Sequence, residues 1–165
     1  MSRGFVKEDD LEHAGTDLPE RQISTHTNYV TPVGLKQLED EASALDKTRA
    51  DLVSQKDNEA AKRKLAVADR DLRYLSARLE QAILVKPAEQ DKSTVLFGAK
   101  VQVKDEDGEL LRFYLVGEDE ADIAQQKVSY VSPIAKALIG RKVGHSVMWK
   151  RPAGAIELEI IEITY

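Results

Sequence analysis

The sequence predicts two parts: an all-α antiparallel coiled-coil hairpin over residues 29–86, followed by an α+β domain over residues 95–165. Three observations support this prediction. Apolar residues recur at spacings of three and four in two consecutive stretches, which is the pattern of a heptad seam. After residue 94 the period changes to two, as is typical of strands. A polar linker, residues 87–94, separates the two patterns.

The hairpin is expected to begin at Thr31-Pro32. Threonine is a good N-cap, and proline suits the first helical position because its missing N–H costs nothing there. Apolar or small residues, with one arginine, then form two seams: Leu35, Leu38, Ala42, Leu45, Arg49 and Leu52, followed by Ala61, Leu65, Ala68, Leu72, Leu75, Leu79 and Ala82.

The two seams share one register when they are folded back on each other, from Leu35 opposite Ala82 to Lys56 opposite Ala61. This register places the turn between Asn58 and Glu59. Each arm then has about 26 residues and a length of roughly 40 Å at ~1.5 Å per residue. Because no glycine or proline marks the turn, one continuous helix with the same heptads is the alternative.

The second part is expected to be a mostly antiparallel sheet with a single amphipathic helix. Pro87 ends the hairpin, and Asp105–Gly108 reads as a turn between two strands. The expected strands are Val95–Val103, Leu110–Val116, Lys127–Val131, Val143–Arg151 and Ala155–Tyr165, and the helix runs from Ser132-Pro133 to Ile139 with Gly140 as its C-terminal cap.

Composition narrows the function classes. The chain has 165 residues, no cysteine and a net charge of −5. The charge argues against autonomous binding to duplex DNA, which needs a basic face. No stretch is long enough to span a membrane and the N-terminus, MSRGFVKEDD, has no apolar signal segment, so a cytoplasmic protein is expected. Residues 1–28 hold their apolar residues singly and are expected to form a mobile or loosely docked arm.

Four strings resemble the GreA/GreB transcription elongation factors. In the second part these are VGEDEAD (116–122), SPIAKALIG (132–140) and Val143-Gly144, and at the start of the first helix the string is YVTPxGL (29–35). The resemblance covers about residues 29–165 and agrees in domain order with the hairpin found from the heptads. It implies an FKBP-like C-terminal domain without dependable prolyl isomerase activity.

The resemblance also implies a partner, bacterial RNA polymerase. In that family the coiled coil enters the secondary channel of the polymerase, where two tip carboxylates help hold a catalytic Mg²⁺. The polymerase then cleaves the 3′ end of a backtracked transcript, so the factor needs no cofactor of its own and meets nascent RNA only inside the complex. Carboxylates suit Mg²⁺ because it prefers hard oxygen ligands.

Carried over to this sequence, the tip residues differ from the family pattern. The family's tip string, GDLSENAEY, is absent, and the register instead puts Asp57 and Glu59 at the tip as candidate metal carboxylates. Ordinary turn-forming residues are the alternative for both. The hairpin is also about a heptad shorter in total than the family pattern.

Three further groups are singled out. Lys62, Arg63 and Lys64 are candidate contacts for transcript phosphates, or else a solvated helix face. Ser132, Pro133 and Ile134 match the region through which relatives dock on the polymerase. The acidic run 118–120 is read as a metal or basic-partner site or, more simply, as an exposed acidic loop.

The sequence therefore favours an accessory elongation factor that binds the secondary channel and modulates elongation, by stimulating transcript cleavage. The alternative is a non-catalytic binder of the same channel that competes with cleavage factors. A prolyl isomerase-like enzyme or chaperone is a third hypothesis, suggested by the fold alone. The oligomeric state and the relative orientation of the two domains are left open.

Overall fold

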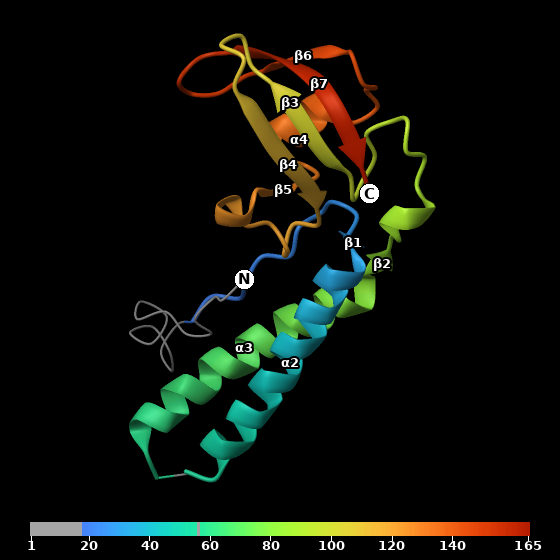
Figure 1. The fold of residues 1–165 in the computed structure, drawn as a ribbon. Helices are drawn as coiled ribbons and strands as arrows, with labels where there is room; N and C mark the ends of the chain where they lie inside the picture. The colour runs from blue at the N-terminus through green and yellow to red at the C-terminus, as the bar shows by residue number, and fades with distance from the viewer. Residues whose placement is uncertain (1–17, 56) are drawn as a thin grey trace. The chain divides into compact units, whose positions relative to one another are not determined.

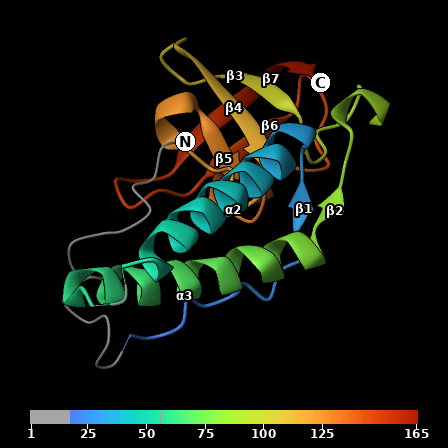
Figure 2. The ribbon, with the colours of Figure 1, turned by 90° about the horizontal axis from the view of Figure 1, so that it is seen from below.

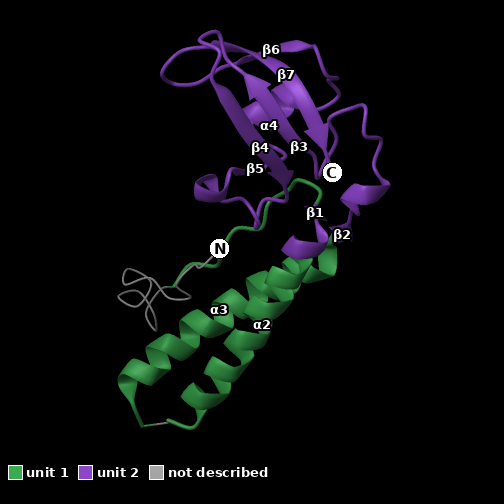
Figure 3. Ribbon diagram, viewed as in Figure 1, with its two compact units in different colours: residues 1–27, 35–82 green, residues 28–34, 83–165 purple. Residues whose placement is uncertain are grey.

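The structure, a computed structural model, describes residues 18–55 and 57–165 (Figure 1). The chain divides into two compact units (Figure 3). Among the described residues, the first combines 18–27 with 35–82, and the second combines 28–34 with 83–165. None of the helices in the described part of the chain has the length and apolar character needed to cross a membrane.

The first unit contains the predicted hairpin, built from α2 (Pro32–Val53) and α3 (Glu59–Gln81). The two helices lie side by side (Figures 1 and 2), which rules out the single continuous helix. Arg49, placed opposite Ala68 by the predicted register, donates from Nε to Asp69 Oδ1 at 2.6 Å. Most of the buried apolar residues of these two helices belong to the predicted seam: Leu38, Leu45, Ala61, Ala68 and Leu75.

The predicted position of the turn is wrong by a few residues. The connection is Ser54–Asn58, and Glu59 is already the first residue of α3. Asn58 sets this start because its side chain accepts a hydrogen bond from the Ala61 N–H at 3.2 Å. At the other end, the Ser54 hydroxyl donates to the Asp51 carbonyl, a local bond that competes with continuation of the helix.

The predicted end of the second helix, at Lys86, is also wrong. α3 stops at Gln81, and β2 (Ile83–Leu84) pairs in parallel with β1 (Tyr29–Val30). Ile83 donates its N–H to the Asn28 carbonyl at 2.9 Å, and Val85 donates to Val30 at 2.9 Å. These bonds draw the chain out of the helix before proline would end it. At ~1.5 Å per residue, helices of 22 and 23 residues are roughly 35 Å long rather than 40 Å.

The N-terminal arm predicted over residues 1–28 lies partly outside the described residues, which begin at Leu18. Residues 18–27, called the strap below, belong to the same unit as the hairpin and run beside α3 (Figure 2). Its Glu20 and Arg21 form ion pairs with α3. The described part of the arm is therefore docked on the hairpin.

The second unit is a five-stranded sheet in the order β5-β4-β3-β7-β6 (Figure 1). Every pair is antiparallel except β4 with β5, so the mostly antiparallel sheet is confirmed. The strands are β3 (Lys100–Lys104), β4 (Leu110–Val116), β5 (Lys127–Ser129), β6 (Ser146–Trp149) and β7 (Ile156–Thr164).

The first expected strand, Val95–Val103, is too long at its start. Gly98 has a φ of +88°, and Ala99 donates its N–H back to the Leu96 carbonyl, so the chain turns before β3 begins. The expected turn at Asp105–Gly108 is confirmed, because Gly108 donates its N–H to the Asp105 carbonyl at 3.1 Å.

Helix α4 (Pro133–Leu138) covers one face of this sheet. Ser132 caps it, and Gly140 follows with a φ of +87°, the left-handed conformation expected after a helix end. Ile134, Ala135 and Leu138 complete the core with residues from the strands and the loop before β3: Val95, Ala99, Val101, Val103, Leu115, Val147, Leu158, Ile160 and Ile163. Each buried valine, leucine or isoleucine of this core contributes about 1.5–3 kcal/mol of transfer free energy.

Candidate functional site

The hairpin tip presents both predicted carboxylates to solvent. Asp57 lies in the connection between the helices and Glu59 in the first turn of α3, and both are exposed. The Glu59 carboxylate is 3.2 Å from the Lys62 ammonium. An acidic residue here also stabilises the positive end of the helix, so Glu59 has a structural use besides any metal. Lys56 lies outside the described residues.

The tip by itself offers too few ligands for a metal site. Among the described residues, no three His, Cys, Asp or Glu side chains lie close enough together to hold a metal ion. Two exposed carboxylates are a poor site for Mg²⁺ alone, because the ion keeps its waters unless more oxygen ligands converge on it. Asp57 and Glu59 fit the ion only as added ligands to a site that a partner supplies.

The three cationic candidates follow the tip on α3. Lys62, Arg63 and Lys64 are all exposed, as a solvated face and a phosphate contact would both require. Lys62 is partly engaged by Glu59. Both interpretations of this cluster stay predictions.

The predicted docking residues at the start of α4 divide into two kinds. Ser132 is the N-cap, and its hydroxyl accepts a hydrogen bond from the Ala135 N–H at 3.4 Å. Pro133 occupies the first helical position and is exposed. Ile134 is buried in the core of the sheet domain, so its side chain supports this surface from below.

Sequence reasoning missed a buried polar junction in the second unit. The Thr31 hydroxyl accepts a hydrogen bond from the Gly34 N–H at 3.0 Å, as an N-cap of α2 should. The same hydroxyl donates to Glu120 Oε1 at 2.5 Å, and Glu120 Oε2 lies 3.4 Å from the Lys127 ammonium. Glu120 is only 3% exposed. These contacts tie the first turn of α2 to the loop after β4.

Two glycines allow this close approach. A Cβ on Gly117 would lie 2.4 Å from the Tyr29 carbonyl oxygen, and one on Gly34 would lie 2.6 Å from Glu120 Oε1. Real Cβ atoms do not come this near to other heavy atoms, so Gly117 requires glycine, because the atom it would meet is backbone. At Gly34 a Cβ would instead force the Glu120 side chain to shift. The signal was present in the sequence, since the strings YVTPxGL and VGEDEAD were both singled out, but their contact was not expected.

The interpretation of residues 118–120 as a simple exposed acidic loop is wrong for Glu120. Its carboxylate is buried because it has a hydroxyl donor and a lysine partner, which is what a buried charge needs. The same surroundings raise the pKa of the Tyr114 phenol above its ordinary value. Burial is the larger cause, and the nearby charge of Glu120 is the second.

An aromatic cluster lies in the same unit. Tyr29, Phe97 and Tyr130 are mutually in contact, with ring centroids 5.5–5.7 Å apart. Tyr130 is two residues before Ser132. The segment that leads into α2 and the turn that leads into α4 therefore share one packed cluster.

Together, these features describe a helical hairpin with an exposed polar tip and a small α+β sheet domain that contains a buried polar junction. Comparison with known proteins shows to which family the chain belongs. Residues 90–165 match the family described as "Transcription elongation factor, GreA/GreB, C-term". The transcription elongation factor GreB of Neisseria meningitidis serogroup B is 38% identical over 160 residues, which cover 87% of this chain and 98% of that protein.

Two further similarities are found, one to a relative in sequence and one to a solved structure. The transcription elongation factor GreA of Thermodesulfovibrio yellowstonii is 36% identical over 151 residues, covering 82% of this chain and 96% of that protein. The crystal structure of GreA factor homolog 1 (Gfh1) of Thermus thermophilus is 24% identical with a TM-score of 0.42, covering 85% of this chain and all of that one. The chain belongs to the GreA/GreB family of transcription elongation factors.

Proposed function

We propose that this chain acts on RNA polymerase, that its hairpin enters the secondary channel, and that Asp57 and Glu59 there assist cleavage of backtracked transcripts. The exposure of both carboxylates at the end of a two-helix hairpin is the observation that carries this proposal. Any catalysis belongs to the polymerase, which supplies the Mg²⁺ and most of its ligands. The factor adds oxygen ligands and positions them.

The docking half of the proposal is carried by the start of α4. Pro133 is exposed on a rigid position, because Ser132 caps the helix and Ile134 anchors it in the core. A preorganised surface of this kind loses little conformational entropy when it binds. We assign to it the contact with the polymerase at the channel entrance.

A second candidate is a non-catalytic binder that occupies the channel and competes with cleavage factors. Two observations favour it. Glu59 is already paired with Lys62, which reduces its availability to a metal. The alignment with the Neisseria GreB runs over 160 positions but uses 87% of the 165 residues, about 144, so about 16 positions of that protein have no counterpart here. A deletion of that size is enough to shorten a hairpin by a heptad or more.

A transcript-cleavage assay on stalled elongation complexes separates the two. The wild-type chain should accelerate cleavage over polymerase alone, and the double variant Asp57→Ala, Glu59→Ala should abolish the acceleration. The matched control is Glu39→Ala, Glu80→Ala, which removes two exposed carboxylates from the same helices away from the tip. Acceleration that survives the tip variant would remove the role of Asp57 and Glu59.

Binding is measured in parallel by retention of polymerase on the immobilised chain. Pro133→Ala should weaken retention, whereas Pro152→Ala, in the exposed turn between β6 and β7, should not. Retention without any cleavage, combined with inhibition of a cleavage-active GreB, would establish the second candidate. The absence of retention would reject both.

A further inference from the structure

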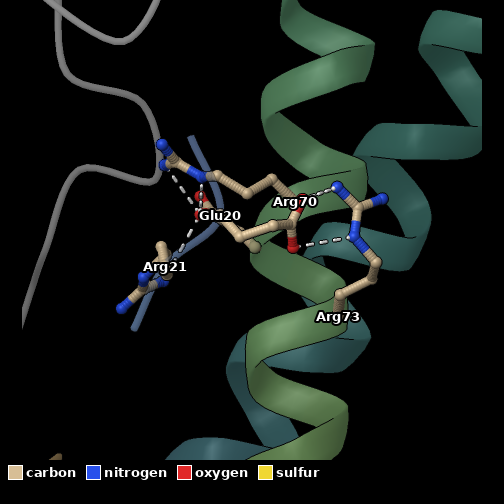
Figure 4. Close-up of polar contacts among 5 residues, drawn as sticks. Glu20, Arg21, Arg70 and Arg73 are labelled. Carbon is tan, nitrogen blue, oxygen red and sulfur yellow. Dashed lines mark hydrogen bonds and ion pairs between the residues drawn. The ribbon is translucent and has the colours of Figure 1, made fainter. Parts of the chain in front are cut away.

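The strap contacts α3 through two consecutive residues of opposite charge (Figure 4). The guanidinium of Arg21 lies 3.8 Å from the ring centroid of Tyr74, and its Nη1 is 3.4 Å from Asp71 Oδ1. Asp71 is buried and also accepts hydrogen bonds from Nε and Nη2 of Arg70, at 3.0 and 2.8 Å. A single arginine of the strap thus meets an aromatic face and a carboxylate that is already fixed in place.

The neighbouring residue points to another part of the helix. Glu20 accepts two hydrogen bonds from Arg73, from Nε at 3.1 Å and from Nη2 at 2.5 Å, the paired geometry that arginine makes with a carboxylate. Figure 4 shows Glu20 between the guanidinium of Arg73 and the strap's backbone. Asp71, Arg73 and Tyr74 therefore form a surface on α3 that recognises a Glu-Arg pair, and this surface is called the strap site below.

The contacts suit reversible docking. The side chains of Glu20 and Arg73 are 62% and 57% exposed, so water and salt compete with their pairing. Arg21 is half-buried, and its guanidinium gains from contact with the Tyr74 ring as well as from its ion pair. A segment held by one exposed ion pair and one half-buried arginine can leave the surface without unfolding the helix beneath it.

We propose that residues 18–27 are an autoinhibitory strap, which covers the strap site on α3 and must be released before the hairpin engages RNA polymerase. This inference rests on the proposed function. While the strap is docked, the hairpin carries a third chain segment along α3, and the Arg73 and Tyr74 side chains are occupied. The released hairpin presents two helices alone, together with a guanidinium and an aromatic ring that an acidic surface of the partner can contact.

Docking of the strap is tested first without polymerase. Trypsin cleaves after arginine, and the Arg21–Gln22 bond is protected while the Arg21 side chain lies on Tyr74. Mass spectrometry should show slow release of the fragment that begins at Gln22 in low salt, and faster release near 1 M salt, where the Debye length is only about 3 Å. Cleavage after Lys92, in an exposed segment, is the internal reference.

Charge variants test the assigned partners. Glu20→Lys should accelerate cleavage at Arg21, and the charge exchange Glu20→Lys with Arg73→Glu should restore protection. Asp40→Lys breaks a comparable exposed pair with Lys36 on α2 and should change nothing at Arg21. Equal cleavage at Arg21 in wild type and Glu20→Lys, or no rescue by the exchange, would overturn the docking as described.

The regulatory consequence is measured by polymerase binding. Glu20→Lys should raise the apparent affinity, by up to about tenfold if the strap is docked in nine of ten molecules. Because the chain has no cysteine, Glu20→Cys with Arg73→Cys can be joined by a flexible, cleavable thiol cross-linker, which should abolish binding until the linker is cut.

The outcomes separate this inference from the proposed function. A cross-linked strap that leaves polymerase binding unchanged would overturn autoinhibition while the proposed function stands. If neither wild type nor Glu20→Lys binds polymerase, the proposed function fails and the regulatory consequence fails with it. In that case the trypsin measurements still decide whether the strap docks.

Discussion

Two carboxylates in this chain make hydrogen bonds of the same length in opposite environments. Glu120 accepts from Thr31 at 2.5 Å within the second unit and is 3% exposed. Glu20 accepts from Arg73 at 2.5 Å on α3, and its side chain is 62% exposed. Length alone does not distinguish them. Burial does, because a buried carboxylate without its partner has no water to replace the lost bond.

The difference gives the two contacts different roles. The buried Glu120 junction stabilises the second unit and holds Thr31, the residue that caps α2. The Glu20 contact exchanges with water at little cost, so it suits a segment that docks and leaves.

The largest change in the free energy of unfolding is expected at the buried junction of Glu120 with Thr31 and Lys127. Glu120→Ala should lower the free energy of unfolding by about 3 kcal/mol, because it leaves the Thr31 hydroxyl and the mostly buried Lys127 without their acceptor. Urea denaturation measures this change. Glu109→Ala, an exposed carboxylate in the turn after β3, should leave it almost unchanged. Equal losses for both variants would remove the contrast.

A smaller loss of stability is expected where the backbone at Gly117 lies close to the backbone at Tyr29. Gly117→Ala should destabilise by about 1–3 kcal/mol, because its Cβ would meet a backbone oxygen of Tyr29 at 2.4 Å. Gly34→Ala should cost less, since the atom it meets belongs to the Glu120 side chain. The comparison is made by thermal and urea unfolding of the two variants. A larger loss for Gly34→Ala would show that the side chain of Glu120 cannot move.

Acid is expected to have the smallest effect on the stability of the whole fold. It should selectively weaken the docking of the strap on α3. The hydrogen bond from Arg73, followed by the charges of Arg73 and Arg70, lowers the pKa of Glu20. Because the pKa of Glu20 is lowered in the docked state, the ionised carboxylate contributes fully to docking at pH values above the ordinary glutamate pKa of about 4.3. This contribution disappears as the pH falls through the lowered pKa. Docking should therefore be constant from pH 8 to about 5 and weaken below about 4.

The Arg73 Nε–H resonance in NMR spectra reports on this docking, and far-UV circular dichroism reports on the fold. The resonance should shift at a pH where the circular dichroism is still native. In Glu20→Gln the shift should be absent. Simultaneous loss of both signals in wild type would show that the strap is not an independently released segment.

Much of the architecture could be predicted from local patterns. Leu38, Leu45, Ala68 and Leu75 repeat at heptad spacing, so one face of each helix had to be buried against another. The strand Leu110–Val116 and the helix that begins at Pro133 were predicted within a residue, because turn residues bound both. These signals are short in range and need no knowledge of the rest of the chain.

The errors have a common cause. α3 was expected to reach Lys86, but the pairing of Ile83–Leu84 with Tyr29–Val30 ends it at Gln81. The candidate tip residues Asp57 and Glu59 were located correctly near the end of the hairpin, although the turn lies earlier than the register indicated. In each case a hydrogen bond to a distant or competing group outweighed a local preference.

The hairpin, the α+β domain and the family could all be predicted from the residues alone, because periodicity, caps and turn residues act within a few positions along the chain. The roles of Glu120 and Glu20 could not be predicted in this way, because their partners come close only when the chain folds. Glu120 meets Thr31 across 89 positions, and Glu20 meets Arg73 across 53. The energy of a carboxylate depends on what surrounds it, and a linear sequence does not state which distant groups, or how much water, will be there.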